Sequence, residues 1–306
     1  MVAVLLQEGN ATMVQQAPFL SGYPILPDDM EIKDLPRAQL YAMNQKLLEE
    51  SIPSEQPLMS EPAPISTLRA EYENGSSSFV AQIDDLVRQG FTSIIRTRGD
   101  GDCFYRSLAF AYIEQLIRAE EPELAVVTAL SGLESQKEKL MKDAGFQEIV
   151  YDLPYGVFTD LIKRIISQSG DLLTSAGLLE TFQDSEGTQT PQYIVMYLRL
   201  LTSAQIRTAP EEFEGFIMHP DTGMKMTVTE FCLHCVDPMG KEADYVQIAA
   251  LSRALQVRIQ IAYLDGRSSD GKVEFVEFNQ GPDSRGQPLL LLYRPGHYDI
   301  IDKNGV

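Results

Sequence analysis

Cysteine and histidine are scarce in this chain, and tryptophan is absent. The 306 residues include three cysteines and three histidines. Three cysteines cannot make a disulfide framework, and Cys232 and Cys235 are too close in sequence for a bridge that would restrain much of the chain. We therefore expect a protein of a reducing compartment, the cytoplasm or the nucleus. So few histidines also allow each one to be considered in turn as a catalytic partner.

Long apolar runs and basic residues are also in short supply. No stretch approaches the roughly 18 uninterrupted apolar residues of a membrane span, and the first ten residues, MVAVLLQEGN, lack the basic start of a secretory signal. Lys and Arg number 25 against 44 Asp and Glu, which gives a formal net charge of -19. This sign is wrong for binding nucleic acid, and it favours basic protein patches or basic peptide tails. We expect neither a nucleic-acid nor a membrane partner.

Proline is the one residue type that is concentrated, and it is concentrated at the front. Eight of the 17 prolines precede residue 65. Within this stretch Leu40, Met43, Leu47 and Leu48 follow a partial helical period, which predicts one helix near residues 35–50. We predict a Pro-rich N-terminal arm with one helix over residues 1–75, followed by a single catalytic domain over residues 76–306.

The patterning of residues 76–306 predicts an α+β domain that is expected to be monomeric. A helix is predicted over 76–90, a short strand over 92–97, a largely helical region over 122–236, and a last helix over 243–255. Alternation then predicts strands at 257–261 and 273–278, and the apolar run at 289–293 predicts a central strand. The domain should thus combine a mostly helical half with a small sheet near its end.

Cys103 lies where a reactive thiol would be expected. The segment RGDGDCFYRSLAFAYIEQL combines a Gly/Asp turn with a helical stripe, which places Cys103 at a helix N-terminus. Such a position supplies partial positive charge that favours the thiolate, and free backbone N–H groups that can stabilise an oxyanion. A buried structural cysteine is the competing interpretation.

Two of the three histidines have an aspartate two positions later. His219 and Asp221 lie in a polar stretch with turn character, whereas His297 and Asp299 follow the predicted strand at 289–293 after a Pro-Gly turn. Residues two apart in an extended segment share a face, so Asp299 can orient the imidazole of His297. The competing interpretation is a surface pair on a strand. His234, in the apolar segment FCLHCV, is predicted to belong to the core.

The remaining motifs do not support a metal or cofactor site. Cys232 and Cys235 form one CxxC without a second pair, which is more typical of a core segment than of zinc. Residues 266–272 resemble a phosphate loop, but they lack the final Ser or Thr and precede a strand, so a hairpin tip is predicted. Asp100 and Asp102 have no further carboxylate nearby to complete a cation cage. We therefore expect no cofactor and no metal.

Several of these segments together resemble the otubains, cysteine deubiquitinases of the OTU superfamily. The resemblance is carried by GDGDCFYRS at 99–107 and LLYRPGHYDI at 291–300, and by the segments at 79–91 and 230–255; it spans about residues 76–302. It implies an OTU (papain-like) cysteine protease fold, in which a small mixed sheet lies between helical subdomains. It also implies a thiol isopeptidase that hydrolyses the bond at the C-terminus of ubiquitin, in ubiquitin chains or conjugates.

The resemblance also assigns roles by position. It makes Cys103 the nucleophile, His297 the general base and acid, and Asp299 the orienting carboxylate. Asp100 would hold the active-site turn, and the amides of residues 101–103, which include Gly101 and Asp102, would form the oxyanion hole.

One residue of the turn departs from the family pattern. Otubains commonly have Asn just before the cysteine, where this chain has Asp102. A carboxylate beside the thiolate is expected to lower activity. Asp102 could instead cap the helix, in which case its charge would still act on the thiolate. This keeps open an alternative function as a weakly active or inactive ubiquitin-binding regulator of ubiquitin-conjugating enzymes. Ubiquitin and polyubiquitin are the expected partners, and the arm would contact a second ubiquitin or a ubiquitin-conjugating enzyme.

Overall fold

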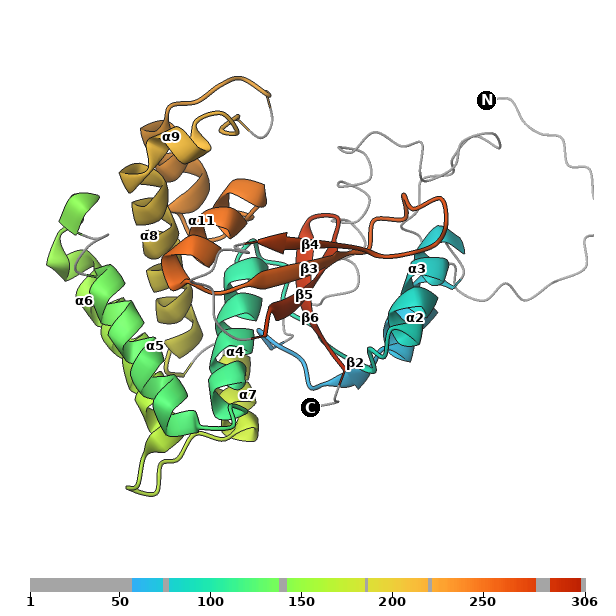
Figure 1. The fold of residues 1–306 in the computed structure, drawn as a ribbon, viewed down its shortest axis with the longest axis horizontal. Coiled ribbons are helices and arrows are strands. Elements are labelled where there is room, and N and C mark those ends of the chain that lie inside the picture. Colours follow the sequence, from blue (N-terminus) through green and yellow to red (C-terminus); the bar gives the residue numbers. More distant parts are fainter. Residues whose placement is uncertain are drawn as a thin grey trace, which may run out of the picture.

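A mixed sheet lies between two layers of helices in a computed structural model of the chain (Figure 1). The structure describes residues 57–73, 77–137, 142–184, 187–219, 222–278 and 287–303. Within these ranges the sheet has six strands in the order β1-β2-β6-β5-β3-β4. Strands β3 and β5 are parallel, and the other neighbours are antiparallel. The strands are β1 (Ala63–Pro64), β2 (Ser93–Ile95), β3 (Ile259–Tyr263), β4 (Glu274–Phe278), β5 (Leu289–Arg294) and β6 (His297–Asp302).

The two faces of the sheet are covered by helical layers of unequal size. Helices α2 (Ser66–Tyr72) and α3 (Ser77–Arg88) cover one face. The other face carries α4 (Cys103–Ile117), α5 (Pro122–Gln136), α6 (Glu148–Lys163), α7 (Ser175–Gln183), α8 (Thr190–Thr208) and α11 (Tyr245–Leu255). Short turns complete the chain: η3 (Arg164–Ile166), α9 (Pro210–Phe213), α10 (Val228–Phe231) and the π-helical turn η4 (Cys232–Val236). The predicted α+β fold, with a small mixed sheet between helical subdomains, is confirmed.

The continuous apolar run of β5 reflects the burial of both faces of this strand. Leu289 and Leu291 face the large helical layer, whereas Leu292 faces α2 and α3. Strand β3 does the same with Ile261 on one side and Ala262 on the other. Because both faces of these central strands are buried, β5 carries an apolar run at 289–293, and the one polar residue of β3, Gln260, is partly buried.

Helix α4 runs through the centre of the molecule and is buried nearly all round. It packs against β5, β6, α5, α7 and α8. The predicted stripe, which includes Phe104 and Leu108, is buried, but so are Ala109 and Phe110 beside it. A helix that is apolar on most sides is a core helix, and its start is therefore fixed by packing on several elements.

The domain begins earlier than residue 76. Leu58 and Met59 are buried, β1 pairs with β2, and Leu68 and Tyr72 of α2 lie in the core between α2, α3 and the sheet. The predicted boundary is therefore wrong for residues 57–73. Proline density misled the prediction because β1 is an edge strand, where Pro64 is tolerated. The helix predicted at 35–50 lies outside the described residues.

The segment FCLHCV is only half buried. Cys232 and Val236 are in a small core beneath α8 and α11, but Leu233 and His234 are exposed. The core assignment of His234 is therefore wrong, because Cys232 and Val236, four residues apart, share the buried face of this turn, and His234 lies on its exposed face. Residues 266–272 connect β3 to β4, which confirms the predicted hairpin tip.

Candidate active site

The turn before Cys103 is held by close backbone contact with a second loop. Cys103 is the first residue of α4, as predicted, and it is buried. Gly101 has φ +81°, and a Cβ at this position would lie 2.2 Å from the carbonyl oxygen of Gly240. Only glycine combines this left-handed backbone with so close an approach. The turn at 99–102 is thus seated on the loop that contains Gly240.

Asp100 closes this turn from within. Its carboxylate makes two contacts with Arg106, at 2.6 and 3.1 Å, and its Oδ1 accepts the N–H of Asp102 at 3.0 Å. This supports the predicted role of Asp100 in holding the turn. It also corrects the predicted oxyanion hole, because the Asp102 amide is already satisfied by Asp100. Of the three amides, those of Gly101 and Cys103 are retained as the expected donors.

Asp102 is directed into the protein. Its carboxylate is buried against Arg199 of α8, with Arg199 Nε at 2.9 Å from Oδ1 and Nη2 also in contact, and it accepts the Gly240 N–H at 3.0 Å. Its side chain makes no capping hydrogen bond to α4. Neither predicted arrangement of Asp102 is observed, since it is neither a helix cap nor an unpaired anion. Its charge is compensated by a guanidinium.

Arg199 was missed by the sequence analysis. It is 1% exposed, and it donates to the carbonyl oxygens of Gly101, Val236 and Lys241 at 3.0, 3.0 and 2.5 Å. Its guanidinium also lies 4.3 Å from the ring centre of Tyr105. One arginine thus ties the nucleophile turn to the loop beyond η4. The only signal in the sequence is a charge inside the apolar run YLRLL.

His297 and Asp299 lie on β6 and form a buried pair. His297 Nε2 is 2.8 Å from Asp299 Oδ1, and neither side chain is exposed. Nδ1 of His297 has no hydrogen-bond partner among the described residues. Burial alone would lower the pKa of His297, but the Asp299 carboxylate and the neighbouring Cys103 outweigh it and raise the pKa to about 9. The imidazole therefore favours its charged form, with one nitrogen free beside the thiol.

Asp299 is fixed by more than the histidine. Its Oδ1 also accepts the N–H of Thr97 at 3.0 Å, and its Oδ2 pairs with Arg294 Nη2 at 2.6 Å. Burial would raise the pKa of Asp299, but Arg294 and His297 hold it well below its usual range. The carboxylate is therefore a permanent anion with both oxygens engaged.

Helix α4 and strand β6 are joined next to the site by a small hydrogen-bond network. Ser107 Oγ lies 2.8 Å from Thr97 Oγ1 and donates to the Tyr298 carbonyl at 3.3 Å. Ser107 is one turn beyond Cys103 on α4, and Tyr298 follows His297 on β6. This network sets the position of the helix along the strand, which brings the thiol beside the imidazole.

The other candidate residues lie elsewhere. His219 is in the loop before Lys225, where its Nδ1 accepts the Thr222 N–H at 3.4 Å, and Asp221 lies outside the described residues. Burial raises the pKa of Cys232 to about 11, which favours an inert thiol. In the part of the chain that the structure describes, no group of three or more His, Cys, Asp or Glu could hold a metal ion.

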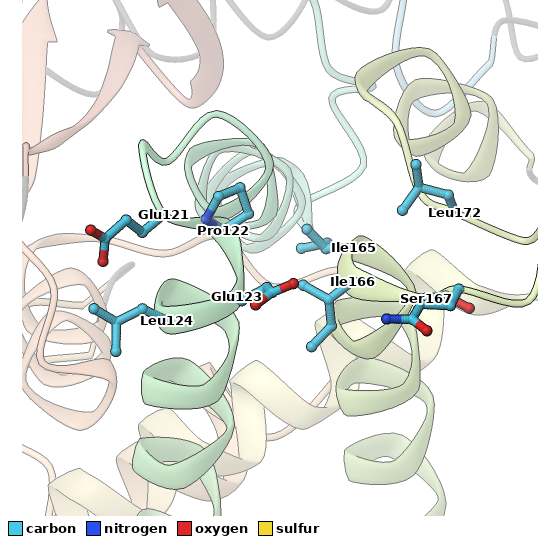
Figure 2. A pocket seen from close by; sticks show the side chains of 9 residues that line it. Glu121, Pro122, Glu123, Leu124, Ile165, Ile166, Ser167 and Leu172 are labelled. Carbon is cyan, nitrogen blue, oxygen red and sulfur yellow. The ribbon is translucent and has the colours of Figure 1, made fainter.

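A separate surface pocket of about 590 Å³ lies between the start of α5 and the η3 turn. Figure 2 shows Pro122 and Leu124 on one side, with Ile166 and Leu172 across from them. The pocket follows the C-terminal end of α4, whereas Cys103 begins that helix of 15 residues, about 21 Å away along its axis. It contains no histidine or cysteine and is not part of the site.

The fold and the site define a class of protein, the papain-like thiol hydrolases. Their thiol begins a central helix, and an imidazole held by a side-chain oxygen faces it from a strand.

Within the described ranges, no helix combines the length and apolar character that a membrane crossing needs.

Comparison with known proteins gives the family. The sequence model of the otubain family, Peptidase C65 Otubain, matches residues 51–303, so the chain belongs to the otubain family. Ubiquitin thioesterase OTUB1 of Homo sapiens is 35% identical over 280 residues, which cover 92% of this chain and 96% of the human protein. The OVARIAN TUMOR DOMAIN-containing deubiquitinating enzyme 1 of Arabidopsis thaliana is 34% identical over 269 residues, 84% of this chain and 85% of the plant protein.

A solved structure shows the same fold. The structure of h/ceOTUB1 with ubiquitin aldehyde and UBCH5B~Ub superposes with a TM-score of 0.71 at 28% identity. The match covers 87% of this chain and 98% of that one. The predicted otubain resemblance and OTU fold are confirmed.

Proposed function

We propose that this otubain is a deubiquitinating cysteine hydrolase in which Cys103 is the nucleophile, His297 the proton carrier and Asp299 its orienting carboxylate. One observation carries the assignment. His297 is buried with Nε2 on Asp299, while its free Nδ1 lies beside a thiol at the start of a long helix. The other buried thiol, that of Cys232, instead lies 3.9 Å from the Ser203 carbonyl oxygen.

The first half of the reaction makes a thioester. The Cys103 thiolate attacks the C-terminal carbonyl carbon of ubiquitin, and the resulting oxyanion accepts hydrogen bonds from the Gly101 and Cys103 amides. The imidazolium of His297 gives its Nδ1 proton to the leaving amine as the C–N bond breaks. The amine departs, and ubiquitin stays bound through sulfur.

The second half regenerates the enzyme. The now neutral His297 takes a proton from water, which attacks the thioester carbonyl. The carbon–sulfur bond breaks, the new carboxyl group of ubiquitin loses its proton to solvent and leaves as a carboxylate, and the thiolate–imidazolium pair is restored. Asp299 remains ionised throughout, and it stabilises the charge on His297 without taking its proton.

Ubiquitin and ubiquitin-conjugating enzymes are the partners of this chain. Related OTUB1 chains are seen with ubiquitin aldehyde and with UBC13~Ub or UBCH5B~Ub. A contact is predicted for the N-terminal arm, residues 1–75, of which residues 1–56 lie outside the described part of the chain.

The main argument for a purely regulatory function does not hold in this structure. The argument for weak activity was an unpaired Asp102 anion beside the thiolate, but Arg199 compensates that charge. The fully buried, paired His297 and Asp299 favour an active hydrolase.

Reaction with ubiquitin that carries a C-terminal electrophile tests the assignment. We expect rapid addition of one ubiquitin to the wild-type chain, no addition to Cys103→Ala, and normal addition to the matched variant Cys235→Ala. Cys103→Ala should still bind ubiquitin, because only the sulfur is removed. Binding of ubiquitin without labelling of the wild-type chain would instead establish a regulator.

A further inference from the structure

We propose that Arg294 is a positioning residue for the Asp299 carboxylate, and that helix α2 holds Arg294 in place through Glu71 and Tyr72. The inference rests on the proposed function, because it concerns how the His297–Asp299 pair is kept in register. It assigns a role to a segment that the sequence places in an N-terminal arm.

Arg294 occupies a defined place beside the site. It ends β5 and is paired in register with His297 across the β5–β6 turn. It is 5% exposed, and its Nη2 lies 2.6 Å from Asp299 Oδ2. Because Oδ1 serves His297 and Thr97, the two oxygens of Asp299 have different fixed partners. Rotation of the carboxylate would break contacts on both sides.

The guanidinium of Arg294 is also contacted by residues of α2. Its Nη1 lies 3.4 Å from Glu71 Oε2, and the side chain of Tyr72 is near enough to interact with it electrostatically. Its Nε has no partner among the described residues. The orientation of Arg294 is therefore set by Asp299 at one end and by α2 at the other. A planar guanidinium can bridge two such acceptors, whereas an ammonium cannot do so in the same geometry.

Helix α2 is well placed to act as a fixed support. Tyr72 is buried, and its ring stacks on Phe79 of α3 with centroids 4.7 Å apart. Glu71 also pairs with Arg96, the residue after β2, with Nη2 at 2.5 Å. The carboxylate of Glu71 thus lies between two arginines. A chain of alternating charges, Glu71, Arg294, Asp299 and His297, leads from α2 to the catalytic imidazole.

The charged groups around this chain determine which way the His297 pKa moves. His297 faces Asp299 of its own strand and Cys103 of α4. Asp299 faces Arg294, His297 and Arg96.

Two substitutions should lower the His297 pKa for different reasons. Glu71→Gln removes a negative charge, so Arg294 acts as a less compensated cation near the imidazole. Arg294→Lys keeps the positive charge but removes the planar guanidinium that contacts both Glu71 and Asp299. Asp299 is then oriented less well for the histidine. A role confined to packing would leave the histidine titration where it is.

The three histidines of this chain make the titration directly measurable. Ring NMR signals of His219, His234 and His297 can be followed with pH in the full-length protein, and the first two serve as internal references. Glu71→Gln and Arg294→Lys would be compared with wild type. Glu73→Gln is the matched control, because it removes the same charge two residues later from a side chain that pairs only with Arg69 among the described residues.

We expect the midpoint of His297 to fall by roughly 0.3 pH unit in Glu71→Gln and by about 1 unit in Arg294→Lys, while Glu73→Gln matches wild type. Labelling by the ubiquitin electrophile at neutral pH should slow at least tenfold in Arg294→Lys, because Asp299 is oriented less well for the imidazole. In Glu71→Gln it should stay within about twofold of wild type, because a pKa slightly below 9 still leaves His297 charged at pH 7.

An unchanged His297 midpoint in folded Arg294→Lys would overturn the proposal. If that variant does not fold, Glu71→Gln and Tyr72→Phe decide, and wild-type midpoints in both would overturn it as well. Failure of the proposed function would look different: the wild-type chain would then not be labelled at Cys103, whereas the titration would still report on Arg294.

Discussion

At the scale of single residues, the pairing of Asp102 with Arg199 changes what Asp102→Asn should do. Repulsion of the thiolate by a neighbouring carboxylate would predict higher activity of this variant below neutral pH. Because the carboxylate is buried on Arg199 and Gly240, we expect the acid side of the kcat/KM profile to stay within about 0.2 pH unit of wild type.

The same substitution should instead lower stability. Asn keeps an acceptor for Arg199 but leaves the buried guanidinium without a counter-charge, so the free energy of unfolding should fall by about 1–3 kcal/mol. Denaturant unfolding of the two proteins measures this. A clear gain of activity at pH 6 with unchanged stability would contradict the observed geometry.

The raised pKa of His297 predicts that kcat/KM falls only at high pH. The imidazolium that protonates the leaving amine persists until about pH 9, so kcat/KM for a ubiquitin amide substrate should be maintained to that pH and then fall. Asp299→Asn removes the carboxylate that raises this pKa, and its limb should lie at lower pH. It should remain more active than His297→Ala, which has no proton carrier. A wild-type limb near pH 6.5 would contradict this prediction.

The same pair links folding to pH. His297 has a higher pKa in the folded than in the unfolded chain, so its contribution to stability is complete below about pH 6.5 and is lost as the pH rises through about 9. Asp299 has a lowered pKa, so its contribution is present above the unfolded value near 4 and is lost as the pH falls through the folded one. The site should thus add most to stability between these ranges, near pH 5–6.

At the scale of elements, the packing of residues 57–65 predicts different stabilities for two N-terminal truncations. The sequence alone gives no reason to expect a difference between them. A chain that begins at residue 57 keeps Leu58, Met59, β1 and Ile65, and we expect it to fold and react with a mono-ubiquitin electrophile. A chain that begins at residue 66 loses three buried side chains and an edge strand, which should cost more than about 5 kcal/mol. Thermal unfolding and soluble yield check this. Equal stability of both chains would show that 57–65 is dispensable.

Elements differ in how well their patterns predict them. The strands at 257–261, 273–278 and 289–293 were predictable because their alternation or apolar run reflects burial on one or both faces. Cys103, His297 and Asp299 were predictable because their relationships are local: a turn before a helix, and two residues on one side of a strand. Arg199 and Arg294 were not, because their partners, Asp102 and α2, are distant in sequence.

At the scale of the whole molecule, the net charge of -19 should act on substrate capture. The C-terminal tail of ubiquitin is basic, so attraction to an acidic enzyme is screened by salt. Between about 50 and 300 mM NaCl we expect KM for ubiquitin substrates to rise several-fold with little change in kcat. Steady-state kinetics at several salt concentrations measure the effect. A kcat that falls while KM stays constant would place the salt effect in the chemistry instead.

The position of β6 in the sheet has a consequence for biosynthesis. It is the last of the described strands in sequence, yet it lies between β2 and β5. A ribosome therefore makes the nucleophile long before it makes the strand that carries the base, and β2 cannot join β5 until that strand emerges. A nascent or prematurely terminated chain lacks both the general base and the middle of its sheet. Hydrolytic competence and a complete sheet are thus reached together, once β6 has been made.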